Sequence, residues 1–133
     1  MEHRPVYTCE EAAKVRGTKI EQAAKALVFK ADTKPVLAVL QGSKEIDEEK
    51  LKHILNAKIL KMARADEVKQ IMECDIGSVH PFGNLAGLKV IVDENLLKEE
   101  DIVFNAGSHT ISIKMKSSDY KKVVEPRIGS FAK

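Results

Sequence analysis

The sequence contains no tryptophan, few other aromatic residues, only two cysteines and no large excess of charge of either sign. Cys9 and Cys74 do not form a Cys-x-x-Cys motif, and a structural disulfide is not expected in a reducing compartment. The histidines are scattered without a pair at helical ligand spacing, so we expect no metal and no cofactor. A net charge of +2 argues against a grip on long duplex nucleic acid, although a small patch could still read one end of a strand.

Long apolar runs are also missing, and this limits where the protein acts. The longest runs, ALVF and KVIV, have the length of strands and are too short to cross a bilayer. No basic segment followed by an apolar stretch opens the chain, so we expect a cytoplasmic protein with no membrane contact. The 133 residues contain no linker rich in proline, glycine or serine, so we predict one domain over residues 1–133.

Local signals predict the secondary structure. A capping box at Thr8 and a stop at Gly17 predict a first helix, and Asp47, Asp66 and Ser117 are expected to start three more. Alternating apolar residues on both sides of a turn at 32–35 predict a hairpin. Further strands are expected at 58–63, 88–93, 101–107 and 109–115, the last two joined at Ala106–Gly107, with a tail from Pro126. We therefore predict a mixed α/β domain with a strongly bent or barrel-like, mostly antiparallel sheet and short surrounding helices.

One lysine in the first long strand is a candidate functional group. Side chains alternate between the two faces of a strand, so Lys25 shares a face with Leu27 and Phe29, opposite Ala26 and Val28. Its ammonium could simply extend to solvent at the strand end. It could also sit at the mouth of a pocket and meet a phosphate or a developing negative charge. Taken alone, this lysine leaves both interpretations open.

Two segments rich in glycine are candidate ligand contacts. The loop GSVHPFGN at 77–84 combines turn residues with Val79 and Phe82, which are apolar and are expected to anchor the loop on the core. Near the end of the chain, Gly107 and Ser108 precede His109, at a point where backbone can approach a ligand closely. A histidine that starts an apolar strand face is more often structural than catalytic. His80 could be an exposed side chain or a substrate contact.

These pieces occur together and in one order, and they resemble the YbaK / prolyl-tRNA-synthetase-associated domain family of aminoacyl-tRNA deacylases. The resemblance rests on AAKALVFKAD, GSVHPFG, VIVDENLL and FNAGSHTISIKM and extends from about Thr8 to Tyr120. It implies a YbaK-like fold and hydrolysis of the ester that links a wrong amino acid to the tRNA 3′ end. It implies no metal and no protein nucleophile, since the tRNA's own hydroxyl and an ordered water do much of the work.

The resemblance also implies roles for particular residues. Catalytic roles are expected for Lys25, Gly77 and His109, and substrate contacts for Pro81, Phe82, Gly83, Gly107 and Ser108. Backbone amides of the loop would stabilise the oxyanion, and a small pocket would select by size.

Trans-editing of a small misacylated amino acid is therefore the expected function, with alanine, cysteine or serine as candidates and alanine on tRNA for proline the first choice. The expected partner is the tRNA acceptor end, with an aminoacyl-tRNA synthetase as a second candidate. One rival interpretation is a regulatory module that binds aminoacyl-tRNA ends or a synthetase without turnover. Another is a protein that binds small nucleotides in the same pocket. Oligomeric state is not readable from the sequence.

Overall fold

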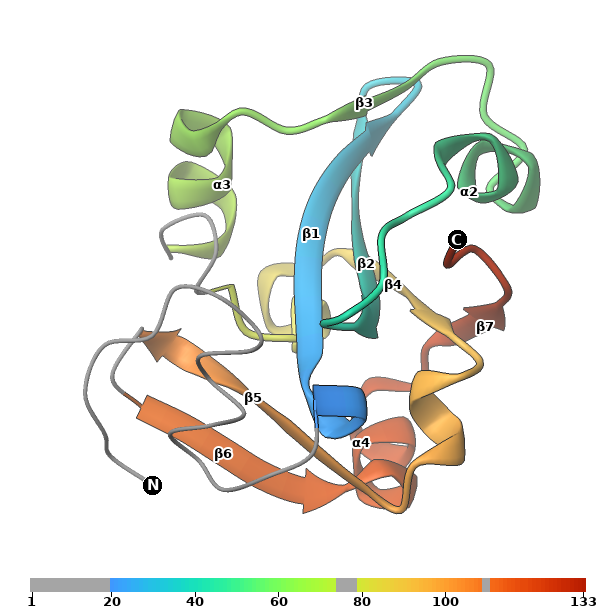
Figure 1. Ribbon diagram of the computed structural model, residues 1–133. Coiled ribbons are helices and arrows are strands. Elements are labelled where there is room, and N and C mark those ends of the chain that lie inside the picture. Colours follow the sequence, from blue (N-terminus) through green and yellow to red (C-terminus); the bar gives the residue numbers. More distant parts are fainter. Residues whose placement is uncertain (1–19, 74–78, 109–110) are drawn as a thin grey trace.

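The fold is built on a five-stranded sheet in the order β3-β1-β2-β4-β7, with β5 and β6 forming a separate two-stranded sheet (Figure 1). The structure is a computed structural model, and it describes residues 20–73, 79–108 and 111–133. Three of the five pairings between these strands are antiparallel and two are parallel, which confirms the predicted mixed α/β class. The strands are β1 (Ala24–Ala31), β2 (Lys34–Gln41), β3 (Leu60–Met62), β4 (Lys89–Asp93), β5 (Asp101–Ser108), β6 (Ile111–Lys116) and β7 (Arg127–Gly129).

The predicted hairpin is confirmed by β1 and β2. They pair antiparallel from Ala24 with Gln41 to Ala31 with Lys34, around a two-residue turn. Asp32 and Thr33 in that turn have φ of 52° and 86°, as a tight hairpin turn requires at both positions. The Asp32 carboxylate accepts hydrogen bonds from the backbone N–H groups of Ile59 (2.8 Å) and Lys58 (3.0 Å), and these lower the pKa of its carboxyl group. The turn is thereby tied to the segment before β3.

Three helices start close to the predicted positions. Helix α2 (Glu48–Ile54) is capped by Asp47, and α4 (Ser117–Val124) begins at Ser117, as expected. The predicted cap at Asp66 is wrong, because α3 (Ala65–Met72) begins one residue earlier, with Arg64 as its N-cap. There the Glu67 carboxylate accepts a hydrogen bond from the Arg64 backbone N–H at 3.1 Å, which satisfies an amide that the helix leaves without a partner. The short 3-10 helices are η1 (Ile20–Gln22), η2 (Gly83–Ala86) and η3 (Leu96–Lys98).

The five-stranded sheet is apolar on both faces, and Figure 1 shows α3 and α2 on opposite sides of β1. We call the side of α3 the first face and the side of α2 the second face. The alternation predicted for β1 is confirmed, since its side chains divide between two separate clusters. The first face carries Ala26, Val28, Leu37, Val39, Val90 and Val92, and the second carries Phe29, Val36, Ala38, Leu40 and Ile91.

The chain after Pro126 is not a tail, contrary to the prediction. Strand β7 pairs parallel with β4, and Phe131 is fully buried on the second face. The carboxylate of Asp93, at the end of β4, accepts hydrogen bonds from the backbone N–H groups of Phe131 (2.9 Å) and Ala132 (3.0 Å). It also accepts one from Asn95 N–H at 3.1 Å. Asp93 is itself buried, as is its bond to Phe131 N–H, and these bonds hold the C-terminal segment in place.

Two other predictions concern the joint between β5 and β6 and the first helix. The joint expected at Ala106–Gly107 is wrong, because β5 continues through both residues to Ser108. The helix expected at residues 9–16 lies outside the described part of the chain. In the described residues, no helix has the length and apolar character needed to span a membrane.

Candidate functional site

The part of the GSVHPFGN loop that the structure describes, from Val79 onward, packs on the first face. Val79 and Pro81 are buried, and Phe82 is partly buried against the same cluster. The Phe82 ring meets the rings of Phe104 and Tyr120 edge to face, at centroid distances of 5.3 and 5.6 Å. Such contacts are favourable for aromatic pairs. The predicted anchoring of the loop through Val79 and Phe82 is confirmed.

A buried tyrosine holds the proline of this loop. The Tyr120 hydroxyl, from α4, donates a hydrogen bond to the Pro81 carbonyl at 2.7 Å. Tyr120 is fully buried, and burial raises the pKa of its hydroxyl, so the group stays a hydrogen-bond donor. Sequence reasoning missed this contact because 39 residues separate the partners. The only sequence signal for this contact was that Tyr120, an aromatic residue with a hydroxyl, lies on the apolar side of the helix predicted from Ser117.

His80 shapes the loop from within. Its Nδ1 accepts a hydrogen bond from the Phe82 backbone N–H at 3.2 Å, so this nitrogen is unprotonated and the neutral ring carries its proton on Nε2. Burial lowers the pKa of the imidazole, because removal from water disfavours the charged form. Sequence reasoning left His80 open between an exposed side chain and a substrate contact, and the structure shows it partly buried and bonded within the loop.

These bonds narrow the search for an oxyanion site. The Phe82 amide is occupied by His80, and Pro81 has no N–H to offer. Neither Pro81 nor Phe82 therefore offers a backbone donor to an oxyanion. Gly77 itself lies outside the described residues, so its predicted role stays a prediction.

Gly83 is explained by packing. A Cβ atom at this position would lie 2.9 Å from Val90 Cγ2 and 3.1 Å from Leu37 Cβ, closer than side chains tolerate. The loop thus needs glycine here to lie flat on β2 and β4. The expected contacts of Pro81, Phe82 and Gly83 with substrate are not tested by this arrangement, and the burial of Pro81 and Gly83 leaves mainly their backbone for such contacts.

Lys25 is partly buried in β1, where it pairs with Leu40 of β2. Alternation places it on the second face with Phe29, whereas the loop packs on the first face. Two residues before Lys25, Ala23 forms a parallel bridge with Val103 of β5. A site that uses both Lys25 and the loop must therefore lie around this end of β1, where the two sheets meet.

The second glycine segment contains a bulge. Asn105 pairs with Ser112 and Ser108 pairs with Ile111, so Ala106 and Gly107 have no counterparts on β6. Bulges of this kind bend a strand and are common beside active sites. Gly107 and Ser108 are in β5, while His109 lies outside the described residues. Within the described part of the chain, no cluster of His, Cys, Asp and Glu could hold a metal ion.

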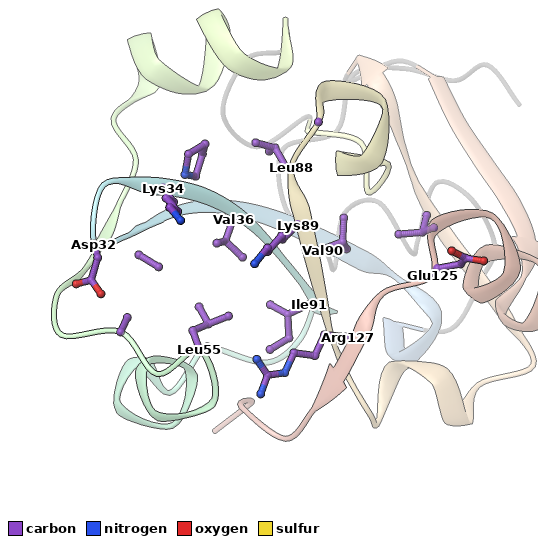
Figure 2. Close-up of a pocket in the computed structure, with 15 residues that line it drawn as sticks. Asp32, Lys34, Val36, Leu55, Leu88, Lys89, Val90, Ile91, Glu125 and Arg127 are labelled. Carbon is purple, nitrogen blue, oxygen red and sulfur yellow. The ribbon is translucent and has the colours of Figure 1, made fainter.

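A cavity of about 750 Å³ lies elsewhere, and none of the predicted site residues lines it (Figure 2). It opens where β2, β4 and β7 begin, beside the end of α2. Apolar side chains such as Val36, Leu55 and Ile91 line it together with Lys34, Lys89 and Arg127. Sequence reasoning missed it because only the parallel pairing of these strands brings the three cations together. The one signal present was a basic residue at the first position of each strand.

The comparison with known families gives the class of protein. Residues 3–123 match the model of the aminoacyl-tRNA editing domain. The chain therefore belongs to this family of aminoacyl-tRNA deacylases, as the resemblance in its sequence indicated.

Particular relatives agree with the family. One is the multifunctional Ser/Thr-tRNA deacylase ProXp-y of Escherichia coli (strain K12), 31% identical over 97% of this chain and 80% of the relative. Another is the proline–tRNA ligase of Bacillus cereus (strain AH187), 31% identical over 63% of this chain but only 15% of the ligase. A crystal structure proposed to be that of a trans-editing enzyme for prolyl tRNA synthetase superimposes with a TM-score of 0.93 over 100% of this chain and 85% of its own. At 22% identity, this last likeness supports the fold alone.

Proposed function

We propose that this protein is a trans-editing deacylase that removes a small, wrongly attached amino acid from tRNA. The observation that carries the proposal is the 31% identity to a Ser/Thr-tRNA deacylase across 97% of the chain. Serine belongs both to the set expected from the sequence and to that relative's name, so seryl-tRNA becomes the first candidate substrate. Alanyl-tRNA for proline, the first choice from sequence, is the second. Since its substrate is tRNA, we place the activity in the cytoplasm.

In the proposed mechanism the protein positions an ester that is already activated. Backbone amides of the 77–84 loop stabilise the oxyanion, and the loop keeps its shape through the Tyr120 and His80 hydrogen bonds. The Lys25 ammonium contacts a phosphate or the terminal ribose near the junction of the sheets. The tRNA's terminal hydroxyl and a water complete the reaction, while the size of the pocket around His109 selects the amino acid.

A regulatory module without turnover is the second candidate. The match to a segment of proline–tRNA ligase favours it, because a domain similar to part of a synthetase could associate with one. Hydrolysis decides between the two candidates.

The test is release of labelled amino acid from a panel of tRNAs charged with serine, threonine, alanine or cysteine. We expect rapid release from one or two of these, and a fall in kcat/KM on the order of 100-fold in Lys25→Ala. Lys44→Ala is the matched control, since Lys44 is an exposed lysine in the turn after β2. It should retain the wild-type rate.

Two results would count against the proposal in different ways. No release above background by folded wild-type protein would reject the enzyme and favour the regulatory module. Release at equal rates by wild type and Lys25→Ala would keep the enzyme but remove Lys25 from its site.

A further inference from the structure

The cavity of Figure 2 lies at the amino ends of three neighbouring strands. β2 and β4 run parallel, as do β4 and β7, so all three strands begin at the same edge of the sheet. Lys34, Lys89 and Arg127 are the first residues of these strands, and all three are exposed. The topology therefore gathers three cations that are far apart in the sequence.

The register places these cations on one face in a diagonal row. Lys89 pairs with Val36, two residues after Lys34, and Arg127 pairs with Ile91, two residues after Lys89. Since Val36 and Ile91 belong to the second face, alternation puts all three cations there as well. One step in the row crosses one strand and two residues, which is about 8 Å between Cα atoms from standard sheet spacings.

The surroundings leave this row positively charged. Among the ion pairs between described residues, none involves Lys34, Lys89 or Arg127. The carboxylates that line the cavity, Asp32 and Glu125, lie at opposite ends of it in Figure 2, Asp32 on the side of Lys34 and both away from Lys89. The Asp32 carboxylate already binds the backbone amides of Lys58 and Ile59.

The shape of the row indicates the kind of ligand. A single phosphate is best held by cations that converge on one point, whereas cations spaced along a line match a chain of anions. The apolar floor of Val36, Leu55 and Ile91 can accept sugar and base surface between the phosphates. An RNA strand presents both features.

We propose that this cavity binds the phosphodiester backbone of the substrate RNA, at a place separate from the site of ester hydrolysis. This inference rests on the proposed function, because that function makes tRNA the ligand. Lys25 and the row of cations share the second face, and the six residue steps from Lys25 to Ala31, which lines the cavity, span about 20 Å of strand. About six nucleotides at about 3.4 Å each cover the same length, so one RNA can reach both places.

The test is direct binding of a fluorescent, uncharged tRNA, measured by anisotropy at several salt concentrations. Lys89→Ala/Arg127→Ala should lower affinity on the order of 10-fold near physiological salt. It should also reduce the slope of log affinity against log salt by about two, since each lost phosphate contact removes about one. Lys44→Ala/Lys98→Ala removes the same charge from exposed positions outside the cavity and should change both quantities little. Equal denaturation midpoints establish that the variants are folded, and Lys89→Gln/Arg127→Gln repeats the test with longer side chains.

Equal losses of affinity in the two double variants, or no measurable binding by wild type, would overturn the cavity proposal. Deacylation measured on the same samples separates the two proposals. Hydrolysis by wild type with identical RNA binding by both double variants rejects the cavity alone. Binding lost only in the cavity variant, with no hydrolysis by wild type on any charged tRNA, rejects the proposed function alone.

Discussion

The candidate loop and the C-terminal segment are both held by a buried polar group from a distant part of the chain, but the two anchors differ. The Tyr120 hydroxyl makes one neutral hydrogen bond to Pro81, whereas the Asp93 carboxylate binds the amides of Phe131, Ala132 and Asn95. Hydrogen bonds to a charged group contribute more than neutral ones. The Asp93 anchor on the second face should therefore contribute more to the free energy of unfolding than the Tyr120 anchor of the loop on the first face.

The largest expected effect comes from breaking the stronger anchor. Asp93→Ala leaves buried amides without an acceptor and should lower the free energy of unfolding by about 3 kcal/mol. Denaturant titration measures this change, and Asp93→Asn, which keeps the size and one acceptor oxygen, should lose less. Deacylation per folded molecule at saturating tRNA should stay near wild type, because the Asp93 hydrogen bonds involve neither the loop nor Lys25. An unchanged midpoint in Asp93→Ala would show that the C-terminal segment does not depend on this carboxylate.

Tyr120→Phe tests the weaker anchor, the hydrogen bond to Pro81. It removes the hydroxyl, keeps the ring against Phe82, and should lower the free energy of unfolding by about 1 kcal/mol. We also expect kcat/KM for deacylation to fall about 10-fold, because a small displacement of the loop misaligns its backbone donors.

Ser117→Ala is the matched control for this variant. Its hydroxyl donates to the Glu99 carbonyl at 2.6 Å from the same helix, α4, without touching the loop. A similar loss of stability with normal kcat/KM is expected. If both variants reduced kcat/KM equally, the effect of Tyr120 would reflect general loosening of α4 rather than positioning of the loop.

The smallest expected effect is the pH dependence that His80 contributes. Its pKa is lower in the folded state than the ordinary value of 6.5, so the unfolded chain binds the proton more readily. The His80 contribution to stability is therefore complete above about pH 6.5 and is lost as the pH falls through the lowered pKa. Protonation of Nδ1 also removes the acceptor for the Phe82 amide.

Denaturant titrations between pH 7.5 and pH 5 measure this contribution as a difference between variants, because carboxylates elsewhere also titrate at the acid end. His80→Gln should show a shallower loss of stability on acidification than wild type. The exposed His53 on α2 supplies the control, and His53→Gln should follow wild type. Parallel curves for all three proteins would contradict the role assigned to His80.

Much of the fold was predictable because its signals are local. Alternation in AAKALVFKA and VLAVLQ gave the hairpin, Asp47 marked the start of α2, and the apolar residues of the GSVHPFGN loop predicted its contact with the core. Each of these depends on neighbours within a few residues, whose backbone geometry decides where side chains point. The cap at Asp66 failed even at this range, because a glutamate side chain that folds back on Arg64 can replace it.

The sequence by itself determined the family, the strand faces and the inward anchoring of the loop, since these follow from residue order and short-range periodicity. Tertiary structure alone decided that Tyr120 holds Pro81, that Asp93 clamps Phe131, and that β7 joins β4 to bring Arg127 beside Lys89. The physical reason is the same in each case. These contacts join segments whose separation along the chain carries no periodic signal, and only the packing of the complete sheet selects which partners meet.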